Sequence, residues 1–498
     1  MKTLKNHKII YIITAFLIIY ALYSLYFLYY TSSMPAIVRL ILALVMLLLV
    51  GFLIQGLNNL TGSYGIFLVK SKKGVKGIAR IAAEHKRFWE AFAAWGMIIG
   101  FGIFSYPLLK GRANKKMFAF GFISLIIIAQ YILPFLSYTS ILISIPQLQS
   151  KIPQPNLSQP LPSLQNYLSS IASNSVYGYI VMILYIVFGF SSFIFIALLV
   201  NTWSILIALS KVIESIIIGK PTTTPLTNQI PGVAPVIPGI TMPLFAGIIS
   251  LAILLSVHEL SHGILASLAK IKLKSVGLIV FGVIPIGAFV EVDEKEVKKR
   301  SKISQNKISI AGVSANFLAM VIFFIPMLIL IPYVFSHIYA TAVFVGSVSP
   351  NYPAEGVLSS GMQILSWNGQ NVTNMTELQS AAANDKPDSL INIITNTGMY
   401  SIIAKQEANS SRGVIGITVY QQIKPVTNTI EKGVAYFLYS IFALSVLLNF
   451  LVGAFNLLPF PSLDGWRIYK TSIKNKNIVK ALAAIIIIAL VLNALPWL

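Results

Sequence analysis

The sequence contains no cysteine, and this absence removes several classes of site. Without thiols the chain has no disulfide framework, no thiolate nucleophile and no thiolate ligand for a metal. Charged residues are also scarce, at 10% of 498 residues against about 25% in an ordinary soluble domain. Hydrophobic residues make up 56%. These proportions exclude a soluble globular chain and a disordered chain, and they predict a polytopic membrane protein.

Acidic residues and histidines are few. Asp and Glu number 15 against 37 Lys and Arg, which gives a net charge of +22. In so apolar a chain this excess indicates basic cytoplasmic loops rather than a nucleic-acid surface, so the expected surroundings are a lipid bilayer. Because there are no thiols and only five histidines, any metal must be bound by His, Asp or Glu.

Long apolar runs set the fold class. A membrane-spanning helix needs about 20 apolar residues, and about nine segments qualify. They lie near Ile9–Tyr30, Ile37–Leu57, Ala91–Leu109, Met117–Ile143, Val176–Leu209, Leu244–Ala269, Ile308–Phe335, Val434–Phe455 and Ile478–Leu495. The first follows a basic start and has no small-residue cleavage site after it, so we expect an uncleaved anchor. We therefore expect a polytopic α-helical membrane protein with about nine spans.

Three stretches lack membrane character. Ser150–Ser175 is rich in Pro, Ser, Asn and Gln and is expected to be an exposed loop, and Pro221–Pro243, with six prolines, is expected to be extended. The third, Thr341–Lys424, is long enough for a small domain. It contains short β-branched runs separated by turn residues such as Asn368-Gly369, and one polar helix-like stretch, Asn374–Asn384. This pattern predicts a small α+β domain inserted between membrane helices. The expected organisation is an N-terminal membrane region at 1–220, a first core part at 221–340, the inserted domain at 341–424 and a second core part at 425–498.

Loop charges predict the orientation. The loops 71–87, 270–307 and 467–480 are net basic, so we expect them in the cytoplasm. With nine spans the inserted domain then lies outside the cytoplasm. The basic loop Lys110–Lys116 disagrees, because the same count places it outside. A re-entrant Ala91–Leu109 segment resolves this conflict only if the chain has another span elsewhere.

The candidate chemistry lies in the sixth apolar segment, which reads His258-Glu259-Leu-Ser-His262. Residues four apart share one face of a helix, so both imidazoles can bind one metal ion. Glu259 lies about 100° further round the helix and can act as a base without binding the metal. Zinc suits two imidazoles and a carboxylate with a fourth position left for water. Ionisable residues at membrane depth are costly, which favours a functional site over packing.

A third ligand must come from elsewhere in the chain. Asp464 follows the eighth apolar segment, after two prolines that break the helix and before Gly465. An Asp-Gly pair alone more often marks only a turn. Another class of membrane protease would use Glu as the third ligand and cut soluble peptides, with Glu291 or Glu294 as candidates. A membrane scaffold or receptor without proteolysis is a further alternative, although a scaffold has no need of Glu259.

Together these motifs resemble the site-2 protease family of intramembrane zinc metalloproteases. The sequence Asn456-Leu-Leu-Pro-Phe-Pro-Ser-Leu-Asp464-Gly465 is similar to a second family motif. Gly287-Ala288-Phe289-Val290 resembles a membrane-associated β-element of the family, and Ala311-Gly312-Val-Ser-Ala-Asn316 resembles the start of the next core helix, with Val313 in place of proline. Val348–Gly369 is similar to a PDZ domain, but Met362 replaces the usual aspartate.

The resemblance implies a role for each of these residues. It makes His258, His262 and Asp464 the ligands of one Zn²⁺ per chain and Glu259 the catalytic base. It implies substrate contacts for Asn456, Asn316 and the run Gly287, Ala288, Phe289 and Val290; helix-end capping, helix packing and a plain hairpin are the structural alternatives. The implied substrates are membrane-spanning proteins, cut in or near their transmembrane segments after an earlier cut has removed a bulky ectodomain. The implied active site lies toward the cytoplasmic face, with the PDZ-like domain on the other side.

Overall fold

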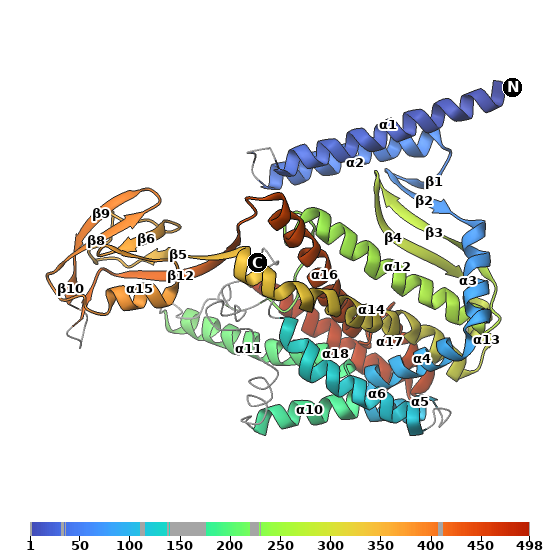
Figure 1. Ribbon diagram of the computed structural model, residues 1–498. Helices are drawn as coiled ribbons and strands as arrows, with labels where there is room; N and C mark the ends of the chain where they lie inside the picture. The colour runs from blue at the N-terminus through green and yellow to red at the C-terminus, as the bar shows by residue number, and fades with distance from the viewer. Residues whose placement is uncertain are drawn as a thin grey trace. The chain divides into compact units, whose positions relative to one another are not determined.

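The computed structural model describes residues 2–30, 34, 36–109, 115–136, 139, 176–219, 229, 231–406 and 412–497. The chain forms two compact units (Figure 1). Unit 1 comprises Met1–Ile329 and Leu438–Leu498, and unit 2 comprises Leu330–Phe437. The predicted loop at 150–175 lies outside the described residues.

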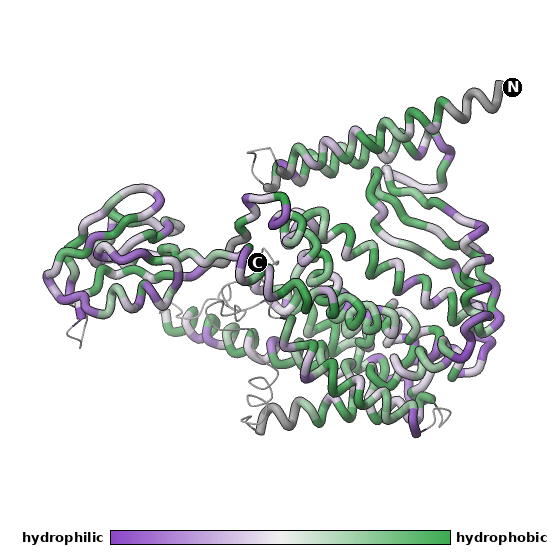
Figure 2. The backbone as a smooth tube through the Cα atoms, viewed as in Figure 1, coloured by the Kyte–Doolittle hydropathy of each residue, from purple (hydrophilic) through white to green (hydrophobic). Residues whose placement is uncertain are grey.

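Unit 1 is mainly helical, and the helices follow the apolar runs (Figure 2). Among the described residues, eight helical segments are long and apolar enough to cross a membrane. They involve α1 (Lys2–Tyr30), α4 with α5 (Lys86–Phe101, Ser105–Leu109), α6 (Lys115–Ile127) continuing to Phe135, α11 (Ser191–Ile218), α12 (Leu244–Leu268), α14 (Lys302–His337), α16 (Ile430–Phe455) and α18 (Lys476–Ala494). The remaining predicted segment lies in α2 (Ala36–Leu57), whose apolar part Ile41–Leu57 is shorter. The predicted membrane-helical fold is thus confirmed, and the count of nine spans stays a prediction.

Two predicted segments are interrupted. The one at 91–109 breaks between α4 and α5 at a 3-10 turn, Gly102–Phe104, where Gly102 has φ 55°. The one at 176–209 is divided into α10 (Val176–Phe188) and α11 by Gly189, whose φ is 64°. The two breaks meet, because Phe190 N–H donates to the Ile99 carbonyl at 2.9 Å. The two backbones approach so closely that a side chain would not fit, since a Cβ on Gly189 would lie 2.4 Å from the Ile99 oxygen. This explains why glycine occupies the break.

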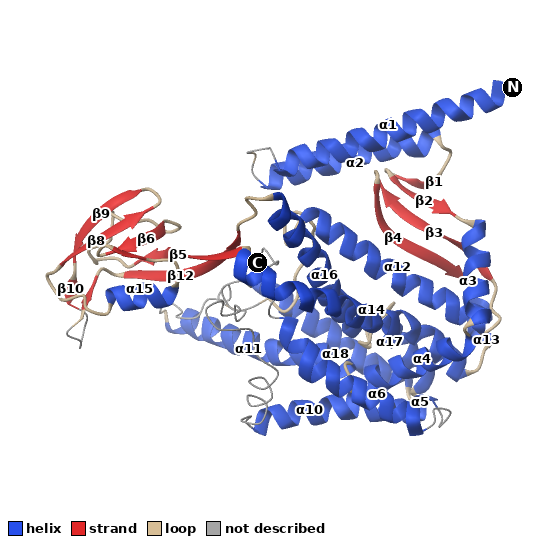
Figure 3. Ribbon diagram, in the orientation of Figure 1, coloured by secondary structure: helices blue, strands red, loops and turns tan. Residues whose placement is uncertain are grey.

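A four-stranded antiparallel sheet lies beside α12 (Figure 3). Its order is β1 (Thr61–Ser63), β2 (Ile66–Lys70), β3 (Leu273–Phe281) and β4 (Ile284–Val292). The predicted β-element at 287–290 is therefore part of β4, an edge strand of this sheet. The face of β4 packs on α12, since a Cβ on Gly263 would lie 2.8 Å from Val290 Cγ1 and one on Gly287 would lie 3.2 Å from Leu255 Cδ1.

Two short helices flank the sheet. The amphipathic helix α3 (Lys72–Glu84) follows β2, buries Ile78 and Ala82, and exposes its basic side chains. Its first turn is capped by Ser71 Oγ, which accepts from Gly74 N–H at 2.9 Å. The helix α13 (Glu294–Lys299) follows β4 and is capped by Asp293.

Unit 2 contains a six-stranded sheet and one short helix. The strand order is β12 (Ile417–Pro425), β5 (Tyr339–Val348), β6 (Gln363–Trp367), β8 (Leu390–Thr395) and β9 (Gly398–Ile403), with β7 (Gln370–Asn371) paired to β6. A two-stranded sheet, β10 (Lys405–Gln406) and β11 (Gly413–Val414), and the helix α15 (Met375–Ala382) complete the unit. Its core includes Val343, Ile364, Trp367, Ile391 and Ile393. Three of the predicted β-branched runs overlap β5, β8 and β9, the fourth overlaps both β11 and β12, and the predicted helix overlaps α15.

Candidate metal centre

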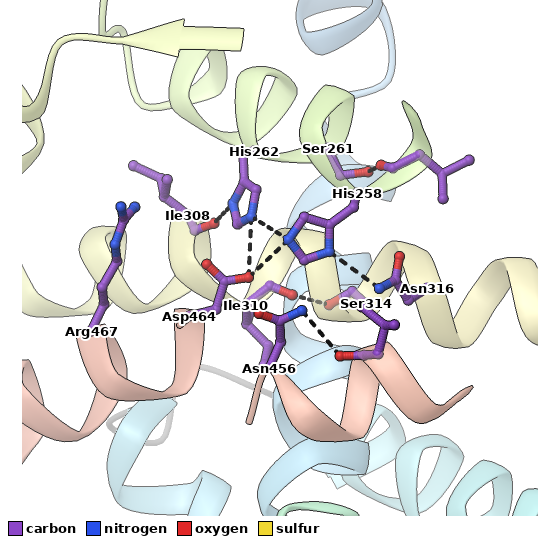
Figure 4. Close-up of polar contacts among 12 residues, drawn as sticks. His258, Ser261, His262, Ile308, Ile310, Ser314, Asn316, Asn456, Asp464 and Arg467 are labelled. Carbon is purple, nitrogen blue, oxygen red and sulfur yellow. Dashed lines mark hydrogen bonds and ion pairs between the residues drawn. The ribbon is translucent and has the colours of Figure 1, made fainter. Parts of the chain in front are cut away.

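Three side chains of unit 1 converge on one point (Figure 4). His258 and His262 lie on the same face of α12, and Asp464 is the first residue of α17 (Asp464–Ser472). Each histidine Nε2 lies 3.2 Å from Asp464 Oδ2. The two Nε2 atoms are also 3.2 Å apart. The structure therefore brings together two side chains that are adjacent on one helix and one that follows them by about two hundred residues.

The chain between α16 and α17 places Asp464 at this point. The prolines Pro459 and Pro461 follow the end of α16, and Leu463 is extended where α17 begins. The turn is closed by Gly465 N–H, which donates to the Asn456 carbonyl at 2.6 Å. A Cβ on Gly465 would lie 2.3 Å from the Leu457 oxygen, so only glycine allows this approach. The local sequence thus turns Asp464 back toward α12.

The donor set fits a metal ion. Two ligand atoms about 2.0–2.2 Å from a tetrahedral zinc lie about 3.3 Å from each other, close to the separations in this triangle. Apart from its contacts with the two histidines, the buried Asp464 Oδ2 has no hydrogen-bond partner among the described residues, as expected of an atom that faces a cation. His262 Nδ1 lies 2.8 Å from the Ile308 carbonyl, which can only accept, so the proton is on Nδ1 and Nε2 is free to bind a metal.

A glycine lies beside the triangle of candidate ligand atoms, where a larger residue would not fit. Gly312 of α14 faces both imidazoles, and a Cβ there would lie 2.5 Å from His258 Nε2. Sequence reasoning noted Gly312 only as part of a motif and missed the Ile308 carbonyl. A backbone carbonyl carries no signal in residue type, so only the register of α14 against α12 reveals it.

The other predicted residues have different surroundings. Glu259 is partly buried next to His258 on α12. Asn456 donates from Nδ2 to the Val452 carbonyl at 3.0 Å, within its own helical turn. Asn316 is fully buried, and its Nδ2 lies 3.2 Å from His258 Nδ1. Gly287–Val290 lie on the edge strand β4, which packs on α12, the helix that carries both histidines.

The alternative glutamate ligands are engaged elsewhere. Glu291 accepts from Ser275 Oγ at 2.8 Å, and Glu294 lies 3.5 Å from Arg467 Nη2. In the part of the chain that the structure describes, neither belongs to the group of metal-ligand side chains formed by His258, His262 and Asp464. The geometry therefore favours Asp464 over these two as the third ligand.

Comparison with known proteins agrees with the part of the chain that carries this centre. The family model described as Peptidase family M50 matches residues 246–495, which include both histidines and Asp464. An uncharacterized protein of Methanocaldococcus jannaschii is 33% identical over 235 residues, covering 46% of this chain. The match spans 58% of that relative's length.

Proposed function

The chain belongs to peptidase family M50, the site-2 protease family of membrane metalloproteases, and from this premise we propose that it is a zinc-dependent intramembrane endoprotease. Its substrates in this proposal are membrane-spanning proteins, hydrolysed in or near their transmembrane segments. The observation that carries the proposal is the triangle of His258, His262 and Asp464, with sides of 3.2 Å, built partly on a helix apolar enough to cross a membrane.

The proposed chemistry divides between the metal and one glutamate. His258, His262 and Asp464 would hold one Zn²⁺, which when bound would polarise the scissile carbonyl and lower the pKa of the attacking water. Glu259 takes the proton from that water and delivers it to the leaving amine nitrogen as the peptide bond breaks. Glu259 follows His258 on α12, about 100° further round the helix, and among the described residues it is not part of the ligand group.

A helical substrate must change conformation before it can be cut. The amides of a membrane helix are bonded internally, so the scissile segment must unwind before hydrolysis. An unwound strand then needs new partners for its backbone, and the edge strand β4 offers them at Gly287–Val290 by strand addition. In the proposal Asn456, at the turn that carries Asp464, contacts the substrate or the developing oxyanion.

Unit 2 is proposed to act before catalysis. We infer that its sheet and α15 form a PDZ-like domain on the extracytoplasmic side, while the centre opens toward the cytoplasm. The domain would dock or filter substrates, so that an intact bulky ectodomain prevents cleavage. This role predicts that the protease acts second, after another enzyme has shortened the substrate.

The proposal is tested with purified full-length protein and a membrane-spanning reporter. Glu259→Gln should retain zinc and lose cleavage, because only the base is removed, whereas Asp464→Asn should lose zinc. Glu294→Gln is the matched control, since Glu294 is exposed and faces Arg467, and it should keep both properties. Full activity and full zinc content in Asp464→Asn would overturn the site, and full activity in Glu259→Gln would overturn the mechanism.

A further inference from the structure

The helix α14 contacts both candidate histidine ligands, at the Nδ1 atoms that face away from the triangle and, through Gly312, beside the Nε2 atoms. His262 Nδ1 lies 2.8 Å from the Ile308 carbonyl, and His258 Nδ1 lies 3.2 Å from the Asn316 amide. Between them, Gly312 lies against both imidazoles. Ile308, Gly312 and Asn316 are spaced four apart, so they form one row on α14 that follows the His258–His262 row on α12.

A histidine can bind a metal through Nε2 only if its neutral ring carries the proton on Nδ1. The partner of Nδ1 decides this, because an acceptor there holds the proton in place. For His262 the partner is a carbonyl, which can only accept. For His258 the partner is an amide, which presents either an acceptor oxygen or a donor nitrogen.

The two orientations of the Asn316 amide differ in what they offer to His258 Nδ1. With Nδ2 toward His258, the Oδ1 atom is buried and has no hydrogen-bond partner in the part of the chain that the structure describes. That arrangement would also make His258 Nδ1 an acceptor and put its proton on Nε2, toward the ligand triangle. With the amide turned by 180°, Oδ1 accepts from His258 Nδ1–H, and Nε2 is left with a lone pair for the metal. Amide orientations are assigned from such networks, since oxygen and nitrogen have nearly the same shape.

Asn316 is enclosed by packed helices beside His258. Its exposed fraction is 0%, and α16 closes over it, since a Cβ on Gly453 would lie 3.3 Å from Asn316 Cβ. We propose that Asn316 is a positioning residue: its amide oxygen fixes the tautomer and the ring orientation of His258 and thereby sets the zinc affinity of the site. This inference rests on the proposed ligation of zinc by His258, and it is an alternative to the substrate contact expected for Asn316.

The test compares zinc affinity in three variants of the detergent-solubilised full chain, by competition with a chromogenic chelator. Asn316→Leu, similar in shape but without an acceptor, should bind zinc about 10- to 100-fold more weakly. Asn316→Asp, which can only accept, should rescue affinity to within a few-fold of the wild type. Asn449→Leu is the matched control, because Asn449 is equally buried with an unpartnered Oδ1 but donates to the Ser445 carbonyl on α16. Its affinity should be unchanged.

The outcomes separate this inference from the proposed function. Wild-type affinity in Asn316→Leu, with a raised KM for the reporter, would return Asn316 to substrate binding and overturn the inference alone. Equal losses in Asn316→Asp and Asn316→Leu would also overturn it, because an acceptor would then be insufficient. A wild-type protein that binds no zinc would overturn the proposed function and this inference together. The absorption spectrum of the Co²⁺-substituted protein gives a second readout of how His258 coordinates.

Discussion

Gly312 lies against His258 with no side chain between them, and a Cβ at position 312 would lie 2.5 Å from His258 Nε2 and 2.6 Å from His262 Nε2. Both atoms are candidate zinc ligands, and the contact leaves no space for a methyl group. We expect Gly312→Ala to push the imidazoles out of register with Asp464. Overpacking costs about 1–3 kcal/mol, which corresponds to roughly 10- to 100-fold in affinity. Zinc content per purified chain measures the loss.

The matched control is Gly433→Ala. Gly433 also lies in a helix, α16, but a Cβ there would have no atom within 4 Å. Alanine favours a helix over glycine by about 1 kcal/mol, so this variant should fold well and keep its zinc. If Gly312→Ala bound zinc as tightly as Gly433→Ala, the proposed ligand positions would be wrong.

Some site residues could be predicted from the sequence, whereas contacts between distant parts of the chain could not. His258, Glu259 and His262 were conspicuous because charged side chains are rare at membrane depth, and two prolines with Gly465 singled out Asp464. The pairing of β2 with β3 could not be read, because Ile66–Lys70 and Leu273–Phe281 are far apart in the chain and no local pattern fixes their register. The same limit explains why the contacts of the Ile308 carbonyl and of Asn316 with the two histidines could not be predicted.

The contact between β4 and α12, the helix that carries His258 and His262, predicts a variant that loses cleavage but keeps its zinc. Val290 of β4 packs on Gly263 of α12, where an added Cβ would lie 2.8 Å from Val290 Cγ1. Gly263→Ala should displace β4 and lower reporter cleavage while the zinc content is retained, because the metal ligands do not depend on that strand. Val290→Ala supplies the missing space, so the double variant should recover activity relative to Gly263→Ala.

Double-mutant analysis makes this coupling measurable. Two residues in direct contact should show an interaction energy of about 0.5–3 kcal/mol in kcat/KM. Additive effects of Gly263→Ala and Val290→Ala would mean that β4 is not positioned through this contact. Loss of zinc in Gly263→Ala would instead show that the change disturbs His262, its neighbour in sequence.

Stability of unit 2 should depend on a buried carboxylate. Asp385 accepts from Trp367 Nε1–H at 2.9 Å and from Asn368 Nδ2–H at 2.8 Å. Trp367→Phe leaves one buried acceptor without a donor, so we expect a loss of about 1–3 kcal/mol in the free energy of unfolding of this unit. Urea-dependent pulse proteolysis of the full chain, following cuts within 330–437, measures it. Ser401→Ala removes only the exposed bond to Asn392 and should change stability by less than about 0.5 kcal/mol.

The effect of Trp367→Phe should depend on pH. Burial raises the pKa of Asp385 above its ordinary value, and the bonds from Trp367 and Asn368 oppose that rise. An acid whose pKa is higher in the folded state stabilises the fold below its unfolded pKa and loses this contribution as pH rises through the folded pKa. Removing the Trp367 donor raises the folded pKa further. The loss should therefore be larger at neutral pH than near pH 4, and a pH-independent loss would contradict this explanation.

The absence of cysteine makes the orientation directly testable, because each introduced thiol is the only one in the chain. Lys298 of α13 and Met399 of β9 are exposed, and α14 is the one apolar helix of membrane-spanning length between them in the chain. If α14 crosses the bilayer, the two positions must lie on opposite sides, whatever the total number of spans.

A membrane-impermeant maleimide should label Met399→Cys in intact cells and Lys298→Cys only after permeabilisation, because the basic loop is expected in the cytoplasm. Lys474→Cys, separated from unit 2 by α16, should behave like Lys298→Cys. Labelling of Lys298→Cys and Met399→Cys from the same side would mean that α14 does not span, and it would contradict the proposal that unit 2 meets substrates on the side opposite the cytoplasmic loops.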